Sequence, residues 1–220
     1  MKIQLALDRM SIAEALAMAR RVEAYVDWIE IGTSLIKEFG MRSVAEFRAT
    51  FPDKVLLADM KTMDNAAYET NLWINAGADI GTVMAVAPAV TVTTCLRVAQ
   101  SHGKQLMMDL LDAPVDKLES CVAMTGALLC LHAGKDQQES VDDFSHLFSH
   151  LGESSSFQPA GKLRIALAGG ITTEILASVV SHFHPEVLIV GEAITKSANP
   201  EQAARQFRTL VHHVTGSDLI

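Results

Sequence analysis

Short apolar runs of strand length alternate with longer stretches of helical periodicity from one end of the chain to the other. This alternation is typical of a parallel sheet whose faces are covered by helices. We expect eight strands, at residues 3–7, 26–31, 54–60, 80–85, 105–110, 127–132, 163–168 and 187–190.

Helix boundary signals lie between the predicted strands. Ser11 and Glu14 have the spacing of a capping box, and Asn199 precedes a proline in the manner of a helix N-cap. Gly77 and Gly103 follow helical stretches and precede strands, where a left-handed backbone residue is favoured. A serine-rich segment at 152–161 is interpreted as a surface loop after a helix at 141–151. The pattern therefore predicts regular strand and helix alternation throughout.

Eight strands and eight helices without a break in composition predict an α/β protein, a single-domain (β/α)₈ barrel spanning residues 1–220. The alternative is an open, doubly wound sheet. Seven of the predicted strands have a polar residue or glycine at or next to their carboxyl end. These are Asp8, Glu30, Asp59, Asp109, His132, Gly169, Gly170 and Gly191. In a barrel they converge on one rim, whereas in an open sheet they are strung along an edge.

Composition narrows the possible partners. The chain has 220 residues, 49% of them hydrophobic, which is enough for one substantial core. A formal net charge of −8 disfavours binding to nucleic acid or to an anionic membrane surface. Three irregularly spaced cysteines predict neither a disulfide framework nor a cysteine-rich zinc site. With no signal peptide or long apolar run, we expect a cytoplasmic protein.

The third predicted strand ends in a dense group of charges, Asp59, Lys61 and Asp64. Alternation along a strand places Asp59 and Lys61 on the same side, so they would face one another at the rim. Opposite charges held in this way stabilise each other's ionised form. We interpret the three residues as catalytic candidates; the alternative is a solvated loop with a salt bridge.

Glu30 interrupts the apolar second strand. On neighbouring strands, Glu30 and Asp59 could offer hard oxygen ligands to Mg²⁺, with Mn²⁺ as a possible substitute. The alternative is that Glu30 pairs with Lys61 and no metal binds.

The last two predicted strands end in glycine turns. Ala168, Gly169 and Gly170 precede one helix, while Gly191 and Glu192 follow the eighth strand. Glycines at these two strand tips allow backbone N–H groups to approach a phosphate, as is usual in such barrels. His132 ends the sixth strand, where a rim histidine can relay protons; the alternative is a core histidine bonded to a backbone carbonyl.

Taken together, these motifs resemble the orotidine 5′-phosphate decarboxylase superfamily. They are Asp59-x-Lys61-x-x-Asp64, Ala6-Leu7-Asp8, Ile29-Glu30-Ile31-Gly32-Thr33, His132-x-Gly134-x-Asp136-Gln137-Gln138, Ala168-Gly169-Gly170 and Val190-Gly191. Within it, the chain is most similar to the 3-hexulose-6-phosphate synthase / 3-keto-L-gulonate-6-phosphate decarboxylase family. The resemblance spans nearly the whole chain in the correct order.

The resemblance implies a Mg²⁺-dependent lyase that works through a 1,2-enediolate of a pentulose phosphate. By this analogy Glu30 and Asp59 hold the metal, Lys61 stabilises the enediolate, and Asp8 contacts substrate. Asp64 typically reaches the partner's active site in this family, which implies a homodimer.

Two positions depart from the decarboxylase branch of the family that the chain resembles, because Ala133 and Glu192 stand where that branch has arginines. They favour the synthase branch, which joins ribulose 5-phosphate and formaldehyde or performs the reverse. A carboxylate at 192 would repel a phosphate unless it turns outward. The alternatives are the decarboxylase and, from a different class, a sugar-phosphate-binding barrel without turnover.

Overall fold

The computed structural model describes the chain apart from residues 115–116, 118–119, 122–123, 125, 135–162 and 217–220. The loop predicted at 152–161 and the helix at 141–151 lie outside the described residues. The strands are β1 (Lys2–Leu7), β2 (Trp28–Ile31), β3 (Val55–Thr62), β4 (Ile80–Met84), β5 (Gln105–Asp109), β6 (Leu128–His132), β7 (Ile165–Ala168) and β8 (Val187–Val190). The helices are α1 (Ile12–Val22), the 3₁₀ helix η1 (Glu23–Tyr25), α2 (Thr33–Phe39), α3 (Met41–Thr50), α4 (Ala66–Asn75), α5 (Ala89–Ser101), α8 (Thr173–Phe183), α9 (Glu192–Thr195) and α10 (Pro200–Thr215). None of these described helices is long and apolar enough to cross a membrane.

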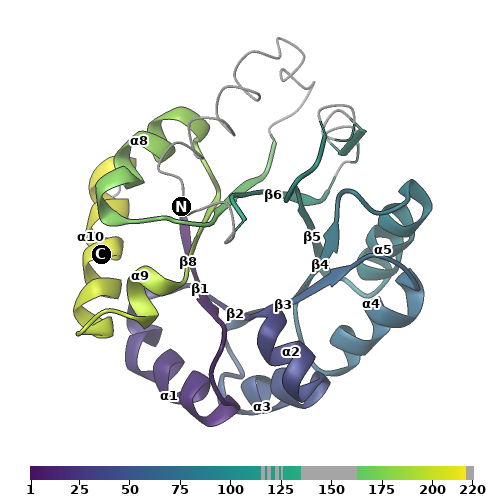
Figure 1. Cartoon of the computed structure of the whole chain (residues 1–220), viewed down its shortest axis with the longest axis horizontal. Coiled ribbons are helices and arrows are strands. Elements are labelled where there is room, and N and C mark those ends of the chain that lie inside the picture. Colours follow the sequence, from purple (N-terminus) through teal and green to yellow (C-terminus); the bar gives the residue numbers. More distant parts are fainter. Residues whose placement is uncertain (115–116, 118–119, 122–123, 125, 135–162, 217–220) are drawn as a thin grey trace.

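The eight strands form a closed barrel of parallel neighbours, surrounded by the helices (Figure 1). The ring closes because β1 pairs with β2 on one side and with β8 on the other. The predicted (β/α)₈ barrel is therefore confirmed, and the alternative of an open sheet is wrong. In a closed parallel ring all carboxyl ends of the strands open on the same rim, which is where such barrels place their active sites.

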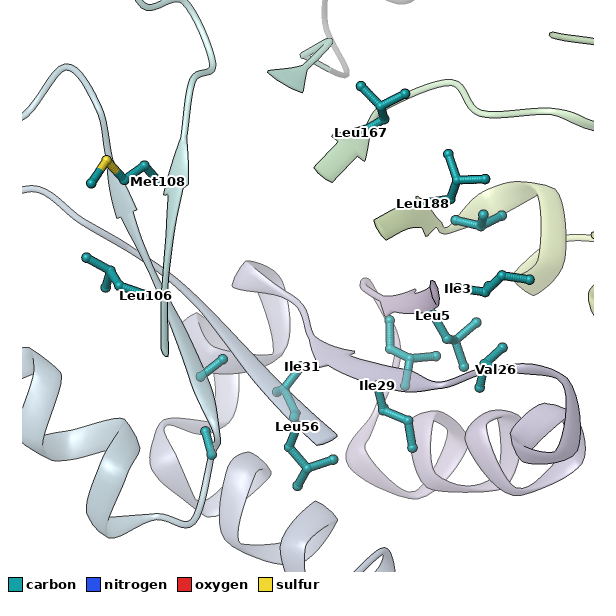
Figure 2. Close-up of a cluster of buried hydrophobic side chains, with 14 of the residues drawn as sticks. Ile3, Leu5, Val26, Ile29, Ile31, Leu56, Leu106, Met108, Leu167 and Leu188 are labelled. Atoms are coloured by element: carbon teal, nitrogen blue, oxygen red, sulfur yellow. The ribbon is translucent and has the colours of Figure 1, made fainter. Parts of the chain in front are cut away.

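Side-chain alternation divides the strand residues between two apolar layers. Outward-facing residues such as Ile3, Leu5, Ile29 and Leu56 are fully buried between the sheet and the helices (Figure 2). The inward-facing layer fills the barrel. Its buried apolar members include Trp28, Leu57, Met107 and Cys130. Two positions later on the same four strands, the inward-facing residues are polar. They are Glu30, Asp59, Asp109 and His132. The barrel interior thus has an apolar floor with a charged layer above it.

Three predicted strand boundaries need correction by two residues. β7 begins at Ile165 rather than at residue 163. β2 begins at Trp28 rather than at residue 26, because Val26 caps η1 and the Asp27 carboxylate turns to accept the Ile3 backbone N–H at 2.8 Å. β3 continues to Thr62, past the predicted end at residue 60, and its register against β4 shifts between Ala58 and Thr62. Lys61 is therefore part of β3, near its carboxyl end.

The local helix signals are confirmed. Ser11 and Glu14 make both bonds of the capping box at the start of α1. The Asn199 side chain caps α10 by accepting the Gln202 backbone N–H. Gly77 and Gly103 adopt positive φ values of 100° and 66° ahead of β4 and β5. The two glycine turns fix where β4 and β5 begin, and therefore which of their side chains face the barrel interior.

Candidate active site

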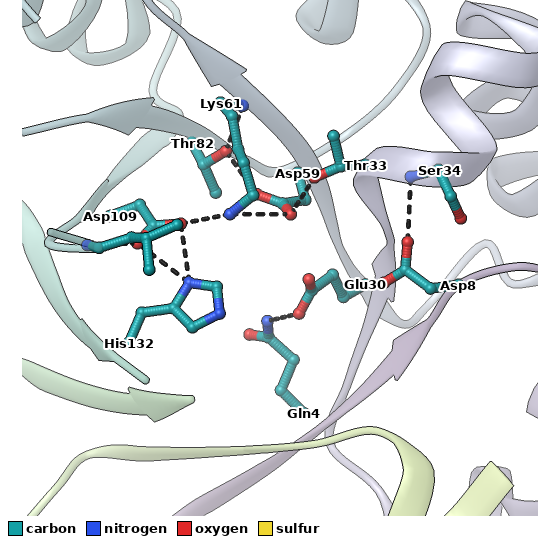
Figure 3. A network of polar contacts seen from close by, with 11 residues as sticks. Gln4, Asp8, Glu30, Thr33, Ser34, Asp59, Lys61, Thr82, Asp109 and His132 are labelled. Atoms are coloured by element: carbon teal, nitrogen blue, oxygen red, sulfur yellow. Dashed lines mark hydrogen bonds and ion pairs between the residues drawn. The ribbon is translucent and has the colours of Figure 1, made fainter. Parts of the chain in front are cut away.

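A continuous polar network lies at the carboxyl ends of β3, β4, β5 and β6 (Figure 3). Its centre is the Lys61 ammonium, which pairs with Asp109 and lies 3.4 Å from an Asp59 oxygen. The predicted contact between Asp59 and Lys61 is therefore confirmed. The Asp59 and Asp109 side chains are nearly buried, and the Lys61 side chain is 24% exposed. This leaves the cation accessible from the mouth while its counter-ions stay fixed.

The backbone at Lys61 is held in an unusual conformation. Its φ is 48°, in the left-handed region that costs a non-glycine residue about 1 kcal/mol or more. The backbone N–H of Lys61 donates to Thr82 Oγ1 at 2.8 Å, and this hydroxyl donates to Asp59 Oδ1 at 2.8 Å. Thr33 Oγ1 donates to the other Asp59 oxygen at 2.5 Å. One threonine on β4 and one at the start of α2 therefore hold Asp59 and the Lys61 backbone in one arrangement.

Asp109 links Lys61 to His132. Its carboxylate oxygens lie 3.1 and 3.0 Å from His132 Nδ1, and the Leu111 backbone N–H donates to Oδ1 at 2.9 Å. Burial alone would raise the pKa of Asp109, but His132 and Lys61 outweigh burial and lower the pKa to about 2. Because Nδ1 is committed to Asp109, Nε2 is the His132 nitrogen that can exchange a proton with a ligand.

The lysine responds to the same charges in the opposite sense. Desolvation alone would lower the pKa of Lys61, but the carboxylates of Asp59 and Asp109 raise it above its ordinary value. Lys61 is therefore a permanent ammonium at neutral pH, suited to stabilising negative charge rather than to removing a proton.

Glu30 projects from β2 into the barrel interior and is only 8% exposed. Gln4 Nε2 donates to Glu30 Oε2 at 2.5 Å. Burial raises the pKa of Glu30 well above its ordinary value, and the nearby Asp59 charge raises it further. In the described chain Lys61 pairs with Asp59 and Asp109 rather than with Glu30, so the alternative pairing of Glu30 with Lys61 is not found.

The residues present fit a divalent cation. Glu30 and Asp59 are two buried carboxylates whose charges repel one another, and a cation between them would relieve that repulsion. Within the described residues, no group of three or more His, Cys, Asp and Glu side chains has a metal-binding arrangement. Mg²⁺ is commonly held by one or two carboxylates together with water and substrate oxygens. The donor set therefore suits Mg²⁺ better than a metal that requires a full protein cage.

Asp8 extends from the end of β1 beside Glu30, whose pKa it also raises. Its Oδ1 accepts the Ser34 backbone N–H at 3.0 Å. A Cβ on Gly32 would lie 2.3 Å from the other Asp8 oxygen, so only glycine leaves room for the aspartate there. Gly32 and the first turn of α2 thus hold Asp8 at the mouth.

The glycine turns follow β7 and β8, on the side of the ring opposite β3 and β4. Ala168 ends β7, and Gly169 and Gly170 then adopt positive φ values of 92° and 59°. Gly191 is the N-cap of α9. The turns and the Lys61 network consequently face one another across the mouth.

Two predicted site residues stand apart from the network. The exposed Glu192 carboxylate pairs with Lys196 Nζ at 2.9 Å, one turn along the chain. Asp64 is exposed in the turn before α4, where it lines a hollow with Val90 and Thr94 of α5. The structure therefore brings Glu30, Asp59, Lys61 and His132 together, and it places Asp64 on the outer surface.

Several members of the network had no role that was predicted from sequence. Asp109 was visible as an acid ending an apolar strand, but only the fold shows that it bridges Lys61 and His132. Gln4 carries a comparable signal, since it is a polar residue inside the apolar run of β1. Thr33 was visible only as the last residue of the motif that contains Glu30, and Thr82 carried no sequence signal, because threonine is ordinary in strands.

Comparisons with known proteins find similarity along nearly the whole chain. The family described as "Orotidine 5'-phosphate decarboxylase / HUMPS family" matches residues 1–207. The 3-hexulose-6-phosphate synthase of Bacillus subtilis (strain 168) is 33% identical over 216 residues, covering 96% of this chain and 99% of that protein. The synthase of Mycobacterium gastri is 32% identical over 214 residues, covering 96% and 100%.

Two solved structures show the same similarity. The 3-hexulose-6-phosphate synthase from Salmonella typhimurium superposes with a TM-score of 0.83 at 33% identity, covering 99% of this chain and 100% of that chain. The 3-keto-L-gulonate-6-phosphate decarboxylase from Vibrio cholerae superposes with a TM-score of 0.80 at 26% identity, covering 97% and 98%.

Proposed function

Because the chain belongs to the orotidine 5′-phosphate decarboxylase / HUMPS family, we propose that it is a Mg²⁺-dependent lyase acting on a carbon–carbon bond of a sugar phosphate. The proposed reaction joins ribulose 5-phosphate and formaldehyde into a 3-hexulose 6-phosphate, or performs the reverse. The observation that carries the proposal is the continuous Asp59, Lys61, Asp109 and His132 network beside Glu30. Its charges match an intermediate with two adjacent oxygens of developing negative charge.

Glu30 and Asp59 are the residues proposed to hold Mg²⁺. When bound there, the ion supplies Lewis-acid stabilisation of negative charge on substrate oxygens. Asp8, fixed beside Glu30 by Ser34, is proposed to orient a substrate hydroxyl.

Lys61 is proposed to stabilise negative charge on the intermediate, and His132 is proposed to transfer the proton. The Lys61 ammonium is held by two carboxylates, so it faces the developing enediolate without reorganising. His132 Nε2 would take the proton from carbon 1 of the pentulose phosphate, while Asp109 supports the imidazolium through Nδ1. Carbon 1 of the enediolate then attacks formaldehyde, and a proton passes to the new alkoxide.

The phosphate is proposed to lie against the glycine turns after β7 and β8. Backbone N–H groups at Gly169, Gly170 and Gly191 can approach an anion because no side chain intervenes. Ala133 and Glu192 provide no guanidinium to this region. This is why we favour the synthase over the keto-gulonate-phosphate decarboxylase.

We propose that the protein works as a homodimer in which Asp64 completes the partner's site. Asp64 lies outside its own network, on a surface with three exposed large apolar side chains. They are Met63 (46%), Tyr68 (61%) and Val90 (71%). Apolar side chains gathered on a surface are typical of an interface between subunits. A cytoplasmic location completes the proposal and suits three free cysteines.

The activity is tested with purified protein, Mg²⁺ and each candidate substrate. We expect formaldehyde to disappear in the presence of ribulose 5-phosphate, and EDTA to stop the reaction. Release of carbon dioxide from 3-keto-L-gulonate 6-phosphate without formaldehyde consumption would overturn the synthase in favour of the decarboxylase. Binding of ribulose 5-phosphate with no turnover of either substrate would identify a binding barrel.

The shared site is tested by mixing two inactive variants, Lys61→Met and Asp64→Asn. In a mixed dimer, one site keeps Lys61 from one subunit and Asp64 from the other, so random exchange should restore about a quarter of wild-type activity. A mixture that stays inactive after verified subunit exchange would reject the shared site.

A further inference from the structure

Gln4 is a polar side chain in the apolar part of the barrel. It lies in the middle of β1 with no exposed surface, and its register partners on the neighbouring strands are Trp28 and Ile189. Both partners belong to the apolar cluster inside the barrel. An apolar side chain of similar size would suit this position, so the amide needs a physical explanation.

The amide is only half satisfied. Gln4 Nε2 donates to Glu30 Oε2 at 2.5 Å, while Gln4 Oε1 is buried without a hydrogen-bond partner in the described chain. A buried unpaired carbonyl destabilises the fold, and most buried polar groups avoid this state. The feature that offsets this cost is the bond to Glu30.

The geometry of that bond constrains Glu30. One carboxylate oxygen accepts from Gln4, and Figure 3 shows the other oxygen directed away from the amide, on the side of Asp59. The described residues offer Glu30 no other hydrogen-bond donor. Without Gln4, its flexible side chain would have several rotamers available.

We propose that Gln4 is a positioning residue, whose amide holds Glu30 in the orientation needed to share a divalent cation with Asp59. The inference rests on the proposed function, because it assigns Glu30 and Asp59 to the cation. Carboxylates that bind metals are themselves usually hydrogen-bonded, and losing such a partner commonly weakens metal binding by about 10- to 100-fold.

The test measures Mn²⁺ binding without substrate, by electron paramagnetic resonance of the free ion. Gln4→Met removes the amide at nearly constant volume, and we expect its dissociation constant for Mn²⁺ to rise at least about 10-fold. Met107→Leu is the matched control, since it changes a buried residue of the same barrel interior and should leave Mn²⁺ affinity unchanged. Urea unfolding of the metal-free proteins verifies that each variant is folded. If Gln4→Met does not fold, Gln4→Asn withdraws the amide by one methylene and should weaken Mn²⁺ binding in the same way.

A double variant separates positioning from a general packing role. If Gln4 acts through Glu30, then Gln4→Met combined with Glu30→Gln should bind Mn²⁺ no more weakly than Glu30→Gln alone. Additive losses, or wild-type affinity in folded Gln4→Met and Gln4→Asn, would overturn the inference while leaving the metal site intact. A wild-type protein that binds no Mn²⁺, with or without substrate, would reject the metal site itself and the inference with it.

Discussion

Both ends of the barrel carry partly buried ion pairs, but at the amino end every acid of these pairs has a cation of its own, whereas at the carboxyl end the acids outnumber the cations. At the amino end, each of three acids lies just before a strand and pairs with its own cations. The pairs are Asp27 with Arg208 and Lys2, Asp79 with Arg48 and Lys104, and Glu186 with Arg164. Asp27 and Asp79 also accept backbone N–H groups from β1 and β3. These clusters join neighbouring strands and helices and leave no charge without a partner of opposite sign.

The carboxyl end gathers more acids than bases. Asp8, Glu30, Asp59 and Asp109 share the mouth with Lys61 and a histidine. The pKa values reflect this difference. Although burial opposes the shift, cations lower the pKa of Asp27 and Asp79, whereas burial and Asp59 raise the pKa of Glu30. The amino end is therefore complete within the chain, while the carboxyl end has the charge distribution of a site that receives a cation and a ligand.

Removing a cation should lower activity much more at the carboxyl end of the barrel than at the amino end. Lys61→Met should lower kcat/KM by about 1000-fold, because it removes an ammonium that faces charge developing in the transition state. Arg164→Met is the matched control, since it removes a paired cation at the amino end. The control should keep kcat/KM within about two-fold of wild type. Kinetics with ribulose 5-phosphate and formaldehyde check both variants, and equal losses would remove the functional distinction between the ends.

Removing a cation at the amino end should instead lower the stability of the fold and leave activity unchanged. The Arg48 guanidinium donates to Asp79 at 2.5 Å and to four backbone carbonyls. Arg48→Met removes all five bonds, and although Asp79 keeps Lys104 and the Leu56 N–H, the change should reduce the free energy of unfolding by about 2–3 kcal/mol, allowing for partial exposure. Urea denaturation measures the change. At a temperature where the variant remains folded, its kcat/KM should match wild type; a stable but inactive variant would contradict the division of roles.

The barrel was predictable from sequence because its signals are local and repeated. Alternation of strand and helix patterns, a capping box at Ser11 and glycines at strand entrances each depend on a few adjacent residues. The errors lie at strand ends. The start of β2 depends on Asp27 contacting Ile3, 24 positions away, and the end of β3 depends on Thr82 accepting from Lys61. Long-range contacts of this kind leave no periodic pattern.

The same distinction applies to the site. Glu30, Asp59, Lys61 and His132 were predictable because a charge or histidine at the end of an apolar strand is conspicuous. The role of Asp109 required the pairing of β5 with β6, which places it beside His132. Gln4 required both its burial and the register of β1 against β2. Sequence therefore identified residues with unusual chemistry, and the fold was needed to identify Asp109 and Gln4, which contact them.

A smaller effect appears in the pH dependence of stability. Burial alone would raise the pKa of Asp79, but Lys104, the Leu56 N–H and Arg48 lower it below its unfolded value. The resulting stability is fully present above the unfolded pKa of about 3.9 and is lost as pH falls through the folded pKa. Asp79→Asn should therefore be less stable than wild type at pH 6, and the difference should shrink on acidification below about pH 4. Urea unfolding between pH 6 and 2.5 measures it, and a difference that grows on acidification would have the wrong sign.

The smallest effect concerns the exposed pair at the mouth. Glu192 and Lys196 are an i, i+4 pair with half-exposed side chains, so Glu192→Gln should change the free energy of unfolding by less than about 0.5 kcal/mol. Its charge lies one residue after Gly191, where the phosphate is proposed to bind, so removing it should lower KM by about three-fold. Glu201→Gln in the first turn of α10 is the matched control and should leave KM unchanged. The reduction in KM should also diminish at high salt, because exposed charges are screened. A KM that rises in Glu192→Gln would instead indicate that Glu192 contacts the substrate directly. Glu192 would then join the acids at the mouth that bind ligands.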